Sequence, residues 1–140
     1  MHEYNARHLT APRTCSETRR SSMPRFLKKS RTYAFYRQEG RCFYCDYPMC
    51  ITSPQEYAQL YGCSLRQAKQ MQCTAEHLLA RCGGGSNQAS NIAAVCKLCN
   101  LRRYQGKMTR QWHTYRELVK SKVVQGRWHP FRLMGSAVQP

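Results

Sequence analysis

Two Cys-x-x-Cys pairs are the residues whose type and spacing point most directly to chemistry. The first pair is Cys42 and Cys45, and the second is Cys96 and Cys99. Each pair places two thiolates one tight turn apart. Four thiolates suit the tetrahedral coordination of Zn²⁺, at about 2.3 Å from each sulfur. We therefore predict one structural zinc site built from all four cysteines.

The separation of the two pairs indicates what the zinc site encloses. A simple zinc ribbon has roughly 15–20 residues between its pairs, whereas residues 46–95 separate them here. The site is expected to close around an inserted body, and two unrelated pairs of buried cysteines are the alternative. The other cysteines fit no such spacing and are interpreted as small apolar residues: Cys15, Cys50, Cys63, Cys73 and Cys82. Of these, Cys73 and Cys82 are a weaker option for a second metal site.

A second group of chemically active side chains lies around and within this insertion. Glu76 stands beside His77, a glycine-rich stretch follows at 83–85, Asn91 comes next, and Asn100 directly follows the second cysteine pair. An imidazole can accept a proton from water near neutral pH. A hard cation held by oxygen ligands can stabilise the charge of a phosphate under attack. These residue types therefore suit phosphodiester hydrolysis.

The order and spacing of these parts resemble the motif of the HNH endonuclease family. That motif has an acid–His pair on a strand, a glycine-rich loop and an Asn that opens a second strand. A His or Asn then lies in the helix after the second Cys-x-x-Cys. The resemblance covers roughly residues 41–104. It implies a ββα-metal fold whose two strands and helix hold one divalent ion, and products with a 5′-phosphate and a 3′-hydroxyl.

Position by position, the resemblance implies a role for each residue of the motif. His77 is the general base that activates water, and Asn91 supports the loop and helps to orient the region of His77. Glu76 and Asn100 are the ligands of the catalytic ion, Mg²⁺ or Mn²⁺. Glu76 stands where Asp is more frequent in the family, and Asn100 where His is, which makes the motif H-N-N. A histidine packed in the core without a catalytic role is the alternative for His77.

The charge of the chain favours a polyanionic partner. Lys and Arg number 23 against 7 acids, for a formal net charge of +16, and such an excess promotes salt-sensitive association with phosphates. A solvated basic face without a fixed target is the alternative. The residues predicted to contact nucleic acid are Arg66, Lys69, Arg81, Arg102 and Arg103.

Residues 53–72 resemble a helix-turn-helix. Ser53 and Pro54 are typical of a helix start, Gly62 is a breaker, and a second helix is expected from Leu65 to Met71. In a DNA-reading hairpin the start of that second helix would face base edges. We favour the alternative, an αα-hairpin that only packs against the zinc site.

The expected architecture is α+β, a ββα-metal core with a four-cysteine zinc site and flanking helices. Residues 1–30 are assigned to a basic, disordered arm, 31–125 to the nuclease domain and 126–140 to a C-terminal tail. Helices are expected at 30–39, 98–104 and 109–123, and strands at 74–79 and 91–95.

The leading functional hypothesis is a metal-dependent DNA endonuclease, with RNA a less favoured substrate. The alternative is a non-catalytic, zinc-dependent nucleic-acid-binding protein. The sequence has no GxxxxGK[ST] phosphate loop, which argues against an NTP-driven motor. An odd count of nine cysteines, no apolar leader and no membrane span predict a cytoplasmic protein, nucleoid-associated if bacterial or phage. Monomer and homodimer both remain open.

Overall fold

The centre of the molecule is an antiparallel hairpin of two short strands. In the computed structural model, which describes residues 23–106 and 109–135, these strands are β1 (Cys73–His77) and β2 (Ile92–Cys96). Cys73 pairs with Cys96, and His77 with Ile92. Every residue of β2 is buried, as expected for a short apolar run covered on both faces.

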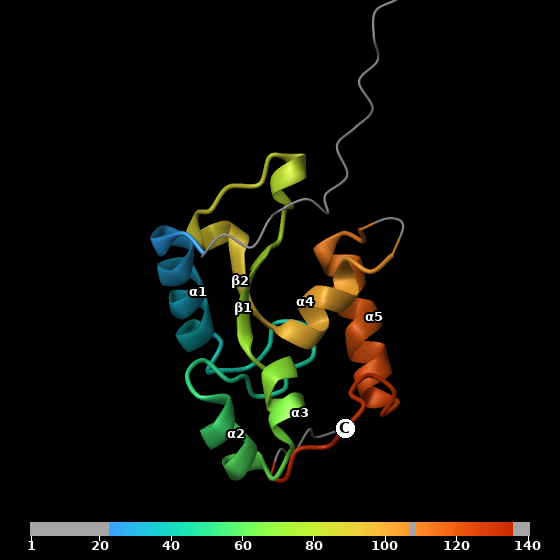
Figure 1. Cartoon of the computed structure of the whole chain (residues 1–140). Helices are drawn as coiled ribbons and strands as arrows, with labels where there is room; N and C mark the ends of the chain where they lie inside the picture. The colour runs from blue at the N-terminus through green and yellow to red at the C-terminus, as the bar shows by residue number, and fades with distance from the viewer. Residues whose placement is uncertain (1–22, 107–108, 136–140) are drawn as a thin grey trace, which may run out of the picture.

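Helices cover both faces of this hairpin (Figure 1). Helix α1 (Arg25–Arg37) lies on one side, and α4 (Lys97–Arg103) lies on the other with α5 (Trp112–Val124) beside it. Because successive side chains of a strand point to opposite faces, Glu76 and His77 face different layers. The observed fold is the predicted α+β arrangement, in which two antiparallel strands are followed directly by a helix.

The first helix is longer than the sequence analysis predicted. Residues 1–30 were assigned to a disordered arm, but α1 begins at Arg25. Leu27, Ser30 and Ala34 are its buried residues, and their spacing of three and four places them on one helical face. Burial of this face against the hairpin extends the helix toward its N-terminus. The rest of the predicted arm, residues 1–22, lies outside the described residues.

The predicted helical hairpin forms from α2 (Pro54–Tyr61) and α3 (Leu65–Gln70). Ser53 Oγ accepts a hydrogen bond from the backbone of Glu56, at 3.2 Å. Gly62 adopts a φ of 59° at the C-terminus of α2, a conformation that glycine adopts without strain. The capping box of Ser64 and Gln67 starts α3. The pair packs at the end of the central hairpin where β1 begins (Figure 1).

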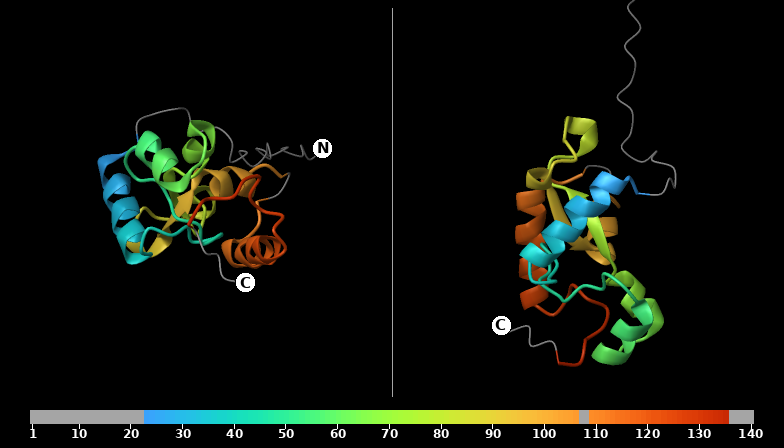
Figure 2. Two further views of the ribbon diagram at one scale, coloured as in Figure 1. Left: turned by 90° about the horizontal axis from the view of Figure 1, so that it is seen from below. Right: turned by 90° about the vertical axis from the view of Figure 1, so that its left-hand side faces the viewer.

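The segment after α5 contributes to the core. Trp128, Phe131 and Leu133 are buried, and the backbone of Met134 donates a hydrogen bond to Tyr61 O at 2.9 Å. The sequence analysis assigned residues 126–140 to a tail. Its described portion instead packs between α5 and α2 (Figure 2). Among the described residues, no helix is long and apolar enough to cross a membrane.

Candidate functional site

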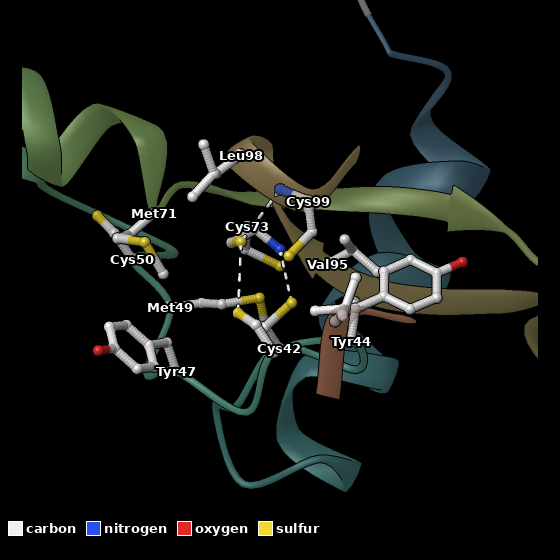
Figure 3. Packing of buried hydrophobic residues seen from close by; sticks show 14 of the residues in the cluster. Cys42, Tyr44, Tyr47, Met49, Cys50, Met71, Cys73, Val95, Leu98 and Cys99 are labelled. Carbon is white, nitrogen blue, oxygen red and sulfur yellow. Dashed lines mark hydrogen bonds between the residues drawn. The ribbon is translucent and has the colours of Figure 1, made fainter. Parts of the chain in front are cut away.

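The four predicted zinc ligands meet at one point. Cys42 and Cys45 lie in the loop after α1, Cys96 ends β2, and Cys99 lies in the first turn of α4. Their four sulfur atoms all lie within 4.8 Å of one another, and all four residues are buried. The close-up in Figure 3 shows this cluster inside the core, near Tyr44, Met49 and Val95.

Three N–H groups point at the sulfurs of this cluster. The backbone N–H of Cys96 donates to Cys42 Sγ at 3.3 Å, and that of Cys99 donates to Cys96 Sγ at 3.5 Å. The indole N–H of Trp128 donates to Cys99 Sγ at 3.2 Å. Donors of this kind stabilise thiolates and orient metal ligands. Burial alone would raise the pKa of Cys42, but hydrogen bonds from its neighbouring thiols bring that pKa well below its ordinary value.

These observations fit a structural Zn²⁺ site. Four soft thiol donors converge, and all four are buried. Three N–H groups donate to their sulfurs. These features together match a closed tetrahedral centre. The site links the loop after α1 to the junction of β2 and α4. Within residues 23–106 and 109–135, no second group of three or more His, Cys, Asp or Glu side chains converges in this way. The Cys73 and Cys82 option therefore gains no support.

Glu76 lies in the α4-facing layer of the hairpin and is 1% exposed. Its carboxylate forms an ion pair with the Arg103 guanidinium. The hydroxyls of Tyr44 and Tyr104 also donate to Glu76 Oε1, each at 3.3 Å. Burial raises the pKa of Tyr44, so its hydroxyl stays protonated as a donor. The carboxylate is thus neutralised and hydrogen-bonded within the protein.

Arg103 makes further polar contacts beyond this carboxylate. Besides Glu76, it donates to Tyr44 Oη at 3.0 Å and to the backbone carbonyls of His77 and Leu78, at 3.2 and 3.3 Å. It is 4% exposed. Its guanidinium therefore ties α4 to the end of β1 and is turned away from solvent.

The predicted ligands of the catalytic ion have different partners in this structure. Asn100 Nδ2 donates to Thr74 Oγ1 at 2.9 Å, while Glu76 is paired with Arg103. Both contacts lie in the layer between β1 and α4. A carboxylate that already neutralises a buried guanidinium does not fit the role of ligand to a divalent cation, because the cation would compete with Arg103 for it.

His77 lies in the opposite layer, at the end of β1. Its Nε2 lies 2.8 Å from Asn87 Oδ1. Because an amide oxygen can only accept, Nε2 carries the proton and Nδ1 keeps its lone pair. The backbone carbonyl of Asn87 in turn accepts a hydrogen bond from Ser30 Oγ of α1, at 3.3 Å. His77 is half-buried as a residue, and this network fixes the orientation of its imidazole.

Asn91 closes the loop between the two strands. Its Oδ1 accepts from the backbone N–H of Leu79 at 2.8 Å. Its Nδ2 donates to Leu79 O at 3.0 Å and to Ser86 O at 2.9 Å. Three bonds from one side chain therefore fix the two ends of the loop that carries Asn87.

The predicted nucleic-acid contacts are not all on one surface. Arg66, Lys69 and Arg102 line a pocket of about 760 Å³ between α3 and α4. Arg81 is exposed in the loop after β1. Arg103 is buried with Glu76. The structure thus brings together three of these cations, separates the fourth and places the fifth in the interior.

Several residues of the site had no signal in the sequence. Asn87 is one polar residue in a loop rich in glycine, serine and asparagine, and Trp128 follows Cys99 at a distance that matches no motif. Tyr44 and Tyr104 contact Glu76 only because the chain folds back on itself.

Comparisons of the chain with protein-family models, with curated proteins and with solved structures find no match. The assignment of a function therefore depends on the geometry of the zinc centre and of the hairpin.

Proposed function

We propose that this chain is an endonuclease of the HNH type with a structural zinc site, and that it hydrolyses phosphodiester bonds in DNA with His77 as the general base. One observation carries the proposal. The His77 imidazole is half-buried and its Nε2 is held by Asn87 Oδ1 at 2.8 Å, in a loop whose ends Asn91 fixes.

This arrangement suits proton abstraction from water. With the Nε2 proton donated to Asn87, the lone pair of Nδ1 can accept a proton as the water oxygen attacks phosphorus. The imidazolium formed in this step keeps its hydrogen bond to the amide oxygen. Asn87 acts through His77 and is therefore a positioning residue. Exposed Arg81 lies in the same loop and can pair with a phosphate.

The proposed catalytic ion, Mg²⁺ or Mn²⁺, has no ready site at Glu76. That carboxylate is paired with Arg103, and Asn100 is bonded to Thr74. The requirement for a divalent ion is therefore a separate question from the role of His77, and the assay below measures both.

The same ion pair favours a second candidate function. A zinc-dependent nucleic-acid-binding protein needs the four-cysteine centre and the basic surface, but it needs no free carboxylate. Neutralisation of Glu76 by a buried Arg103 is compatible with such a module. In that case Glu76 and Arg103 stabilise the packing of α4 against the hairpin.

Cleavage of supercoiled plasmid tests the proposal. The purified full chain is compared with His77→Ala and with the matched control His113→Ala, whose histidine is exposed on α5. Each is assayed with Mg²⁺, with Mn²⁺ and with EDTA, and zinc content is measured in every arm. We expect nicking by the wild type and by His113→Ala, and none by His77→Ala.

Two results would contradict the nuclease. Full activity of His77→Ala would remove His77 from the mechanism. Absence of cutting by the zinc-loaded wild type, together with a salt-sensitive gel shift, would favour the binding module. Parallel assays with RNA and size measurement by sedimentation would establish the preferred nucleic acid and the oligomeric state.

A further inference from the structure

The outer face of α1 carries a row of exposed aromatic rings. Phe26, Tyr33 and Tyr36 are 62%, 59% and 69% exposed. With 3.6 residues per turn, these positions lie on one side of the helix. Leu27, Ser30 and Ala34 lie on the buried side. The right-hand view in Figure 2 shows α1 at the front of the molecule, with no described element over its outer side.

Cations are interleaved with these rings. Lys29 lies between Tyr33 and Tyr36 around the helix, Arg37 lies at the edge of the same face beyond Tyr33, and both cations are exposed. The Arg37 guanidinium lies 5.6 Å from the centre of the Tyr33 ring. The sequence of α1 contains no acidic residue. We name Phe26, Lys29, Tyr33, Tyr36 and Arg37 the α1 face.

Two of the exposed rings are held by neighbours in the same helix. Phe35 packs edge-on against Tyr36, with ring centres 5.3 Å apart, and Arg37 covers Tyr33. Restriction of the rings before binding reduces the entropy lost when a ligand stacks on them. Large aromatic side chains that stay exposed in a row are unusual on a surface without a partner.

We propose that the α1 face binds single-stranded nucleic acid, with bases stacked on the aromatic rings and phosphates paired with Lys29 and Arg37. Aromatic rings interleaved with cations form the general binding surface for single strands, since every base offers a flat face to stack. A duplex conceals those faces within its own stack. A second copy of the chain is a poor occupant, because two acid-free basic helices would repel each other.

This inference rests on the proposed function only for the class of partner, a nucleic acid. Helix α1 and His77 belong to the same layer: Ser30, on the buried side of α1, donates to the backbone of Asn87, and Asn87 holds His77. A strand bound along α1 therefore lies on the side of the hairpin that carries the proposed base. The preferred substrate is then DNA with an unpaired segment beside the cut.

Binding is measured with zinc-loaded His77→Ala protein and no added Mg²⁺ or Mn²⁺, so that cutting cannot obscure it. Fluorescence anisotropy compares labelled oligo(dT) with a hairpin duplex of equal nucleotide number. Tyr33→Ala, Tyr36→Ala and Phe26→Ala are each added to this background. Leu60→Ala is the matched control, because Leu60 is 73% exposed on α2.

We expect tighter binding of oligo(dT) than of the duplex, and at least an approximately fivefold loss for each ring removed. Leu60→Ala should leave the affinity unchanged. Lys29→Gln combined with Arg37→Gln should reduce the slope of log affinity against log salt by about 1.4, while the ring variants leave that slope unchanged.

Equal affinity for both probes, unaffected by the ring variants, would overturn the inference. So would a change from dimer to monomer in the ring variants without a change in binding, because the occupant would then be a second copy. Absence of plasmid cleavage with intact, ring-dependent binding would remove only the nuclease proposal. Plasmid cleavage with ring-independent binding would remove only the α1 face.

Discussion

At the scale of single residues, Arg103 joins α4 to β1 and to the loop after α1. Its guanidinium pairs with Glu76 and donates to Tyr44 and to the backbone of His77 and Leu78. A buried charge is tolerated only while its partner is present. The folded state therefore depends on Arg103 to neutralise the Glu76 carboxylate, which is nearly inaccessible to solvent.

Arg103→Met tests this dependence. Methionine keeps much of the side-chain volume but leaves the Glu76 carboxylate unpaired, and we expect a loss of about 3–5 kcal/mol in the free energy of unfolding. Urea denaturation of the zinc-loaded protein measures the loss. Arg81→Met, at an exposed position, should change stability by less than about 0.5 kcal/mol. Equal effects of the two substitutions would argue against the buried pair.

His129 gives a prediction for pH. Its ring stacks on Tyr47, with centres 3.4 Å apart, and its Nε2 has no hydrogen-bond partner among the described residues. Burial lowers its pKa from 6.5 to about 4. Between these two values the unfolded chain binds a proton that the folded chain does not. Stability should therefore fall as the pH drops from about 6.5 toward 4.

His129→Phe retains a ring for stacking and removes the titrating group. The variant should lose less thermal stability than the wild type between pH 7 and pH 5, as measured by Tm in a pH series. His113→Phe alters an exposed histidine and should follow the wild-type slope. Identical slopes for all three proteins would assign the acid sensitivity to other groups, such as the zinc ligands.

At the scale of elements, α5 and the segment after it contact the four-cysteine cluster. Tyr115 of α5 donates to the backbone carbonyl of Cys99 at 2.7 Å, and Trp128 donates to Cys99 Sγ at 3.2 Å. The Arg102 guanidinium lies over the Trp128 ring, 4.7 Å from its centre. These contacts bring α4, α5 and the C-terminal segment to one cysteine.

Trp128→Phe tests the contribution of this segment to metal binding. Phenylalanine retains an aromatic ring but removes the indole donor, and loss of such an outer contact typically weakens metal binding about 10–100-fold. Competition with a chromogenic zinc chelator measures the change. Trp112→Phe is the matched control, because Trp112 packs on Phe43. Unchanged zinc affinity in Trp128→Phe would show that the donor is dispensable.

At the scale of the whole molecule, the four cysteines lie within the main core. That core cluster also contains Tyr44, Met71, Val95 and Val119, and the central sheet formed by the described residues has two strands. A structural zinc ion contributes an apparent ~10–16 kcal/mol to the folding of small domains. The metal is therefore expected to be a main source of stability here.

Cys96→Ser should unfold the chain or reduce its Tm strongly, because it removes one predicted zinc ligand, the sulfur that lies 3.8 Å from Cys45 Sγ, and the acceptor of the Cys99 N–H. Circular dichroism and zinc analysis measure the outcome. Cys63→Ser, at a half-buried position outside the cluster, should retain zinc and most of the stability. A zinc-free Cys96→Ser protein with wild-type Tm would contradict the structural role of the metal.

The sequence by itself determined the features that depend on short-range spacing. The two Cys-x-x-Cys pairs predicted the four cysteines that converge. Ser53, Pro54 and Gly62 marked the limits of α2, and the strands expected at 74–79 and 91–95 lie within two residues of β1 and β2. Each of these signals lies within a few residues of the structure that it specifies. Local backbone geometry and side-chain chemistry are therefore sufficient to predict them.

Only the tertiary structure decided which distant side chains meet. It paired Glu76 with Arg103 instead of with Asn100, it set Asn87 against His77, and it brought Trp128 to Cys99. The N-terminal start of α1 and the burial of residues 128–133 also depended on packing. These outcomes result from desolvation and long-range contact, since a buried charge or donor takes the partner that the fold places within reach.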